Sequence, residues 1–156
     1  MAGEMITIDY SLKPAVVRRD RSSFRMRSID DAALKHIAQG KIYVTDDKHR
    51  HYFIIESQIV DYASQLMGVV SEFDKGNLET FAVSPDFFSN NIRFTLDPKA
   101  REVEVYEVNG GSFCVKLGYK LFRNAVHGFY HELVADLPFY YPGIVGSAAY
   151  QRLVSL

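Results

Sequence analysis

Two histidines four residues apart are the first residues in this sequence that could do chemistry. They are His127 and His131 in "HGFYHE", and Glu132 follows directly. On an α-helix, side chains four apart share a face, so two imidazoles at this spacing could hold one metal ion. Zinc peptidases with such a pair place a glutamate next to the first histidine, whereas Gly128 follows His127 here. The sequence therefore does not match the catalytic metal motif.

Helical geometry predicts where these two imidazoles point. If Phe122 marks the centre of a buried apolar stripe, a turn of about 100° per residue carries His131 about 180° and His127 about 140° away from it. Lys120 and Arg123 lie near them in the sequence, and positive charges disfavour a divalent cation. We therefore expect both imidazoles to face solvent, and we expect no catalytic residue, metal ion or other cofactor.

The segment "DDKHRH", residues 46–51, is the second candidate for metal binding. Its possible ligands are Asp46, Asp47, His49 and His51. Lys48 and Arg50 oppose a cation there, and no feature of the sequence brings this segment to His127. We interpret it as the polar tip of a hairpin.

Five arginines within residues 18–27, "RRDRSSFRMR", could contact the phosphates of a nucleic acid, with Phe24 stacking on a base. The whole chain has a pI near 6.5, which is poor support for a dedicated nucleic-acid binder. The same guanidinium groups could instead pair with acidic groups of their own chain. We therefore do not expect a nucleic acid as the partner, and the role of Arg18 to Arg27 stays open.

A row of carboxylates stands out in the most acidic part of the chain, residues 51–108, which hold ten acidic and four basic residues. In "REVEVYEV", alternation along a strand places Glu102 and Glu104 on one face and the intervening valines on the other. An exposed carboxylate row can steer a basic partner toward the protein. Together with the acidic pair at the hairpin tip, the candidate partner-binding residues are Asp46, Asp47, Glu102 and Glu104.

Length and composition predict one folded domain over residues 1–156, because 47% of the residues are hydrophobic and 24% are charged. The lone Cys114 lies in an apolar stretch and is expected to be a small buried residue in a reducing compartment. No apolar run approaches the about 18 residues of a membrane span, and no secretory signal is recognisable. We expect a soluble, cytoplasmic protein that does not contact a membrane.

Hydrophobic periodicity and turn residues predict most of the secondary structure. The strands are expected at 5–10, at 41–45 and 51–56 as a hairpin, and at 91–97, 101–108 and 112–119 as a meander. The helices are expected at 29–39, capped by Ser28 and ended by Gly40, at 58–73, at 120–137, closed by Pro138, and from Ser147 onward. The connection 77–91 has room for one short edge strand.

Residues 15–28 allow two interpretations, a strand, turn and returning strand or one long extended segment. With the other elements, they predict an α+β fold in a single domain. In it, an antiparallel β-sheet, formed by the hairpin and the three-stranded meander, packs against two or three helices.

Residues 91–137, under a third of the chain, have a pattern of strands and helix that is similar to one seen in a known class of proteins. Its β-meander runs into a "V-x-L" strand and a helix of the kind "F-x-x-A-V-x-G-F-Y-x-E-L". The residues that carry this pattern are Val115, Leu117, Phe122, Ala125, Val126, Phe129, Tyr130, Glu132 and Leu133. In this respect the chain resembles small bacterial immunity proteins of polymorphic or contact-dependent toxin systems.

The resemblance implies a non-enzymatic protein-binding module that binds and neutralises a cognate toxin domain. Two alternatives stay open, a secretion-type chaperone for an effector protein, usually a dimer, and a small metal-assisted hydrolase that uses His127 and His131. The mass in solution separates the first alternative from an immunity protein, and metal analysis tests the second. The sequence does not decide the partner's identity, the binding surface or the oligomeric state.

Overall fold

The computed structural model describes residues 6–46, 51–83, 92–107 and 114–156, and it has an α+β fold. One antiparallel sheet contains β1 (Ile6–Leu12), β2 (Gln39–Asp46) and β3 (His51–Gln58) in the order β1-β2-β3. The other contains β4 (Phe81–Ala82), β5 (Ile92–Asp97), β6 (Glu102–Glu107) and β7 (Cys114–Gly118) in chain order. We call them sheet 1 and sheet 2. The predicted fold class is confirmed.

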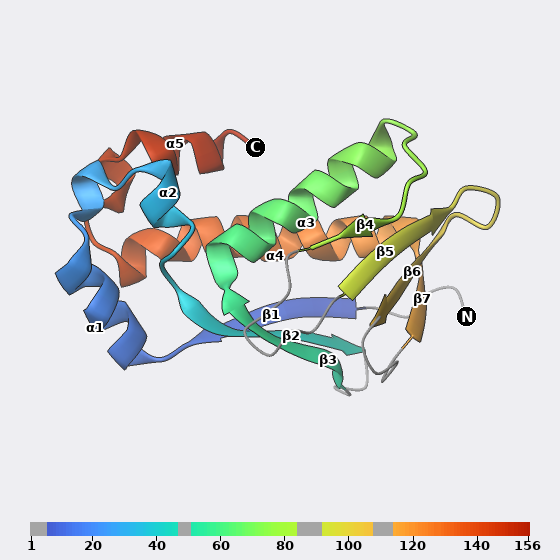
Figure 1. Cartoon of the computed structure of the whole chain (residues 1–156), viewed down its shortest axis with the longest axis horizontal. Coiled ribbons are helices and arrows are strands. Elements are labelled where there is room, and N and C mark those ends of the chain that lie inside the picture. Colours follow the sequence, from blue (N-terminus) through green and yellow to red (C-terminus); the bar gives the residue numbers. More distant parts are fainter. Residues whose placement is uncertain (1–5, 47–50, 84–91, 108–113) are drawn as a thin grey trace.

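The helices cover the two sheets and close one end of the molecule. They are α1 (Pro14–Ser23), α2 (Asp31–Leu34), α3 (Ile59–Asp74), α4 (Tyr119–Tyr140) and α5 (Ala148–Val154), with short 3-10 turns η1 (Met26–Ser28) and η2 (Ile144–Gly146). In Figure 1, α3 and α4 run side by side above the sheets, and β1 lies alongside α4. The helices α1, α2 and α5 gather at the end opposite sheet 2.

The predicted hairpin and meander are both present, but within the described residues they belong to two separate sheets and do not form the single sheet that was predicted. Each gains one strand at its edge. β2 pairs with β3, and β5, β6 and β7 pair in sequence. β1 adds to the hairpin through antiparallel pairing with β2, and the short β4 adds to the meander through β5. The connection 77–91 thus holds the expected edge strand.

The two long helices follow the predicted apolar stripes, but α4 does not end at Pro138. The proline lies inside the helix, which continues to Tyr140. Proline lacks an N–H, so the carbonyl oxygen of Val134 loses its helical donor. That oxygen instead accepts a hydrogen bond from the Tyr150 hydroxyl at 2.9 Å. A contact from α5 therefore allows the helix to continue through the proline.

Residues 15–28 form neither predicted arrangement of strands. They form α1 and η1, so both interpretations of this segment were wrong. Pro14 occupies the first turn of α1, where its fixed φ suits a helix and its missing N–H costs nothing. Arginine is also a good helix former, and the apolar periodicity is weak because Asp20 takes one buried position.

The predicted helix at 29–39 is much shorter, since α2 ends at Leu34. Its N-cap is Asp30, whose carboxylate accepts the N–H of Ala33 at 2.8 Å, so Ser28 is not the cap. Gly40 lies in β2 and does not end a helix. A Cβ at Gly40 would lie 2.3 Å from the carbonyl oxygen of Ser11, so the close pairing of β1 and β2 requires glycine there.

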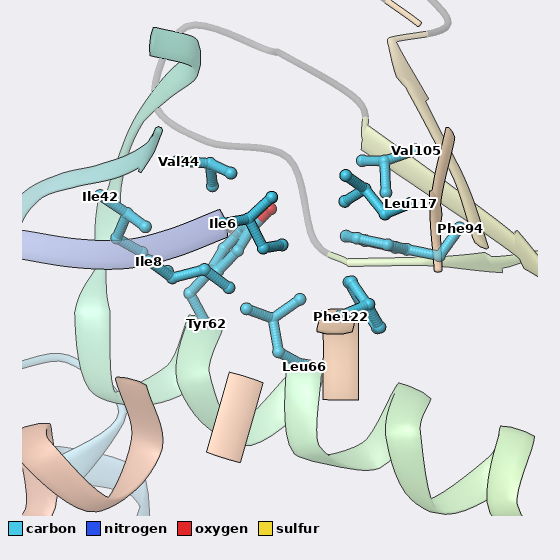
Figure 2. Close-up of a pocket in the computed structure, with 10 residues that line it drawn as sticks. All are labelled: Ile6, Ile8, Ile42, Val44, Tyr62, Leu66, Phe94, Val105, Leu117 and Phe122. Atoms are coloured by element: carbon cyan, nitrogen blue, oxygen red, sulfur yellow. The ribbon is translucent and has the colours of Figure 1, made fainter. Parts of the chain in front are cut away.

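The core contains a small apolar cavity between the two sheets, about 20 Å³ in volume. Figure 2 shows its lining: Ile6, Ile8, Ile42 and Val44 from sheet 1, Phe94, Val105 and Leu117 from sheet 2, and Tyr62, Leu66 and Phe122 from the helices. This is about the space of one water molecule, but an apolar wall offers water few hydrogen-bond partners. The cavity marks where the two sheets are less tightly packed.

Candidate functional site

The two histidines of α4 differ in their surroundings. His131 is exposed, as expected, with its ring centroid 6.0 Å from that of His127. His127 is partly exposed and lines a groove between α3 and α4, so it is less accessible to solvent than the prediction for both imidazoles implied. Helical geometry within α4 predicts only which residues share a face of that helix. It does not predict that α3 partly covers the face that carries His127.

The α3–α4 groove has a volume of about 500 Å³. Its residues are Ser64, Met67, Gly68, Val70, Ser71, Asp74, Lys75, Arg123, His127 and Leu156. The carboxylate of Asp74 accepts a hydrogen bond from the Tyr119 hydroxyl at 2.5 Å and another from Nε of Arg123 at 3.1 Å. This network joins the end of α3 to the first turns of α4.

Burial and charge set the protonation of the α3–α4 groove. Burial lowers the pKa of His127, and the positive charges of Arg123 and His131 lower it further. Burial alone would raise the pKa of Asp74, but the hydrogen bonds from Tyr119 and Arg123 outweigh it and the pKa is lowered. Burial and the hydrogen bond to Asp74 raise the pKa of Tyr119. Near neutral pH the groove thus holds a neutral imidazole beside a satisfied carboxylate.

Among the residues that the structure describes, no three His, Cys, Asp or Glu side chains lie close enough to hold a metal ion. The hairpin-tip candidates Asp47 and His49 lie outside the described residues. The backbone of His51 begins β3, but its side chain also lies outside the described part. Among the described residues, Asp74 is the acidic residue that the fold places in the groove with His127. Its carboxylate already accepts hydrogen bonds from Tyr119 and Arg123.

The carboxylate row on β6 has the predicted geometry. Val103 and Val105 are buried at 0% and 2% exposure, while Glu102 and Glu104 are partly exposed on the opposite face of sheet 2. The strand register places Asp97 beside Glu102, so a third carboxylate joins the row. We call Asp97, Glu102 and Glu104 the acidic face. Asp97 was missed because its place depends on the pairing of β5 with β6.

The other two predicted partner-binding residues belong to a different part of the fold. Asp46 ends β2 in sheet 1, and its side chain lies outside the described part, as does the whole of Asp47. Glu102 and Glu104 lie on β6 in sheet 2. Of the four residues, only these two glutamates form a described surface.

Cys114 was expected to be buried, but it is exposed on β7. β7 is an edge strand in which Leu117 turns inward, so alternation turns Cys114 and Lys116 outward. Its thiol donates a hydrogen bond to Oε1 of Glu104 at 3.5 Å. Slight desolvation and the neighbouring Glu104 carboxylate raise the pKa of the thiol, so it remains protonated beside the acidic face.

The five arginines of residues 18–27 are exposed on α1, on η1 and in the segment between them. Arg19 lies 3.9 Å from the carboxylate of Asp20, the one ion pair of this cluster within the described residues. Pairing with the protein's own acidic groups therefore accounts for one arginine. The other four are exposed on α1, on η1 and between them, at the end of the molecule away from sheet 2.

Comparisons with family models, curated proteins and solved structures gave no match to this chain. Within the described residues, no helix has the length and apolar character needed to cross a membrane.

Proposed function

We propose that this protein is a non-enzymatic binding protein, an immunity protein that binds and neutralises a bacterial toxin domain. The observation that carries the proposal is the acidic face on sheet 2. Its glutamates project from a strand whose alternate residues, Val103 and Val105, are fixed in the core. A rigid strand holds these charges in place, so little conformational entropy is lost when a partner binds.

The charge of the acidic face points to a basic partner. Asp97, Glu102 and Glu104 lie on neighbouring strands, with Lys116 as the basic residue paired with Glu104. Complementary charge speeds association and disfavours wrong partners. A toxin that cleaves nucleic acid needs a basic groove for phosphates, and a row of carboxylates can occupy such a groove. We therefore propose a nuclease toxin as the partner.

The α3–α4 groove supports a structural role in preference to catalysis. Both donors at Asp74 come from the protein itself, and they join α3 to α4. A catalytic carboxylate or imidazole needs to reach a substrate atom. Here the carboxylate is already occupied, and the network contributes to helix packing.

The test is co-expression with the product of the neighbouring open reading frame in a growth assay. The wild-type chain is expected to restore growth and to co-elute with that product. The double variant Glu102→Lys, Glu104→Lys should protect less. The matched control is Asp61→Lys, Glu72→Lys, which makes the same charge change at partly exposed residues of α3 and should protect fully. Full protection by the sheet variant would contradict the proposal.

A further inference from the structure

We propose that the protein has a second protein-binding site, in which an extended segment of a partner joins sheet 1 beside β1. The site is a groove of about 350 Å³ between β1 and α4, here called the β1–α4 groove. Its residues are Ile6, Thr7, Ile8, Leu121, Asn124, Ala125, Gly128, Phe129 and Glu132. The inference does not rest on the proposed function, because the acidic face belongs to sheet 2.

The free edge of β1 supplies the backbone groups for this pairing. β1 is the first strand of sheet 1, and among the residues that the structure describes it pairs only with β2. The N–H of Tyr10 donates to Oδ1 of Asp9 at 2.8 Å, so it points away from the ladder with β2. Backbone direction alternates along a strand, so the N–H and C=O groups of Ile8 and Ile6 point to the same side. An added strand can pair with these groups.

The floor of the β1–α4 groove favours a strand with apolar side chains on its inner face. Leu121, Ala125 and Phe129 recur every four residues on α4, and they line the groove with Ile6 and Ile8. In an extended segment every second side chain points the same way. Those that face α4 would meet this apolar surface and extend the packing of β1 against the helix.

Gly128 keeps the middle of the groove open. It is an exposed glycine inside α4, and a Cβ added there would meet no atom within 4 Å. Glycine within a helix costs about 0.5–1 kcal/mol relative to alanine, so the missing side chain carries a stability cost. Beyond the groove, the Tyr10 ring packs against Phe129, with 6.2 Å between the ring centroids. The Tyr10 hydroxyl donates a hydrogen bond to the carboxylate of Asp136. The open stretch therefore lies beside Ile6 to Ile8.

Charge complementarity identifies the occupant. Glu132 is the one charged side chain among the described residues that line the groove, and Asp9 is exposed on the neighbouring part of β1. In a segment that alternates basic and apolar residues, the apolar side chains would face α4 and the basic side chains would lie on the outer face, on the side of Asp9. Glu132 adds a negative charge to the groove itself. A second copy paired edge to edge would add another Asp9 and Glu132 to the same seam. A basic segment of a different protein therefore fits better.

The test uses a fluorescein-labelled peptide of alternating lysine and valine, with binding measured by anisotropy at low salt. Wild-type protein is expected to bind it. Gly128→Leu fills the groove and should weaken binding about tenfold or more, and Glu132→Lys should also weaken it. Gly68→Leu is the matched control, because Gly68 is likewise an exposed helical glycine with no atom within 4 Å of an added Cβ. It should bind as the wild type does.

Two further peptides separate strand addition from charge attraction. One carries N-methyl groups on alternate backbone nitrogens and keeps every side chain, and it should not bind. The other replaces lysine by glutamate and should not bind either. Equal binding of the N-methylated peptide, or of the first peptide to Gly128→Leu, would overturn the proposal. So would a wild-type dimer that Gly128→Leu converts to a monomer, because a second copy would then be the occupant. Gly128→Leu should still protect cells against the toxin, because Gly128 is not part of the acidic face. The protection assay therefore tests the proposed function independently of peptide binding.

Discussion

The hydroxyl of Tyr141 donates a 2.6 Å hydrogen bond to the carboxylate of Asp20, which is only 3% exposed. The same carboxylate oxygen accepts the backbone N–H of Ala38 at 2.9 Å. Asp20 thereby joins α1, the residue just before β2 and the residue just after α4. A buried carboxylate is tolerated when donors satisfy it, so these contacts hold three distant segments together.

Removing the Tyr141 hydroxyl should destabilise the protein. In Tyr141→Phe the buried Asp20 carboxylate keeps only the Ala38 donor of the two described, and loss of one such partner costs about 1–3 kcal/mol. Chemical denaturation measures the free energy of unfolding. The control Tyr140→Phe alters the neighbouring, partly exposed tyrosine and should change that free energy by less than about 0.5 kcal/mol. Equal effects of the two variants would show that the contact to Asp20 contributes nothing.

Two glycines should respond to alanine in opposite directions. Gly128→Ala adds a methyl group in open space on α4 and should stabilise the protein by about 0.5–1 kcal/mol. Gly40→Ala would place its Cβ 2.3 Å from the Ser11 carbonyl oxygen and 2.8 Å from the side chain of Ile59, so it should destabilise the protein. Thermal melting measures both. A Gly40→Ala variant as stable as the wild type would contradict the close approach of β1 and β2.

The apolar cavity should accept one extra methyl group. Val105 lines it, so Val105→Ile has space to fill and should be neutral or stabilising. Val103 lies on the same face of β6, is fully buried and does not line the cavity. Overpacking there should cost about 1–3 kcal/mol in Val103→Ile. Urea denaturation compares the two, and an equal loss in both would mean that the cavity has no usable space.

Stability should fall on the acidic side because of His127. Burial, together with Arg123 and His131, holds its pKa below the ordinary 6.5 in the folded protein. The unfolded chain therefore takes up a proton first as the pH falls. The contribution of the neutral imidazole is fully present above about 6.5 and is lost as the pH falls toward the lower folded pKa.

The measurement is the free energy of unfolding as a function of pH, compared with that of His127→Gln. The variant should lose less stability between pH 6.5 and the folded pKa of His127. Asp74 acts in a separate window, because its lowered pKa makes its contribution disappear only below 3.8. His36→Gln changes an exposed histidine and serves as the control. A curve for His127→Gln that follows the wild type would contradict the burial of His127.

Regular periodicity made much of the fold predictable. The stripes of α3 and α4, the β2–β3 hairpin and the β5–β7 meander each depend on residues close together in the sequence. α1 was missed because its buried Asp20 finds donors 18 and 121 residues away, at Ala38 and Tyr141. From the sequence alone, an aspartate is expected at the surface, and its burial can be predicted only when its hydrogen-bond donors are known.

The residues of the candidate sites were likewise predictable where their positions depend on local geometry, and not where they depend on contacts between segments. Alternation alone predicted the orientation of Glu102 and Glu104, since strand geometry is local. Asp97 needed the register between β5 and β6, and the cover of His127 needed the packing of α3 on α4. Pairing between strands and packing between helices decide such positions, and neither is encoded in the spacing of a single segment.

The most direct test is the rate at which the protein associates with the product of the neighbouring open reading frame, measured by stopped flow at several ionic strengths. The wild-type rate should fall steeply as salt screens the acidic face. Glu102→Lys, Glu104→Lys should associate about tenfold more slowly at low salt and approach the wild type at high salt. Asp61→Lys, Glu72→Lys should behave as the wild type. Unchanged association by the sheet variant, or equal slowing by both variants, would contradict a binding role for the acidic face.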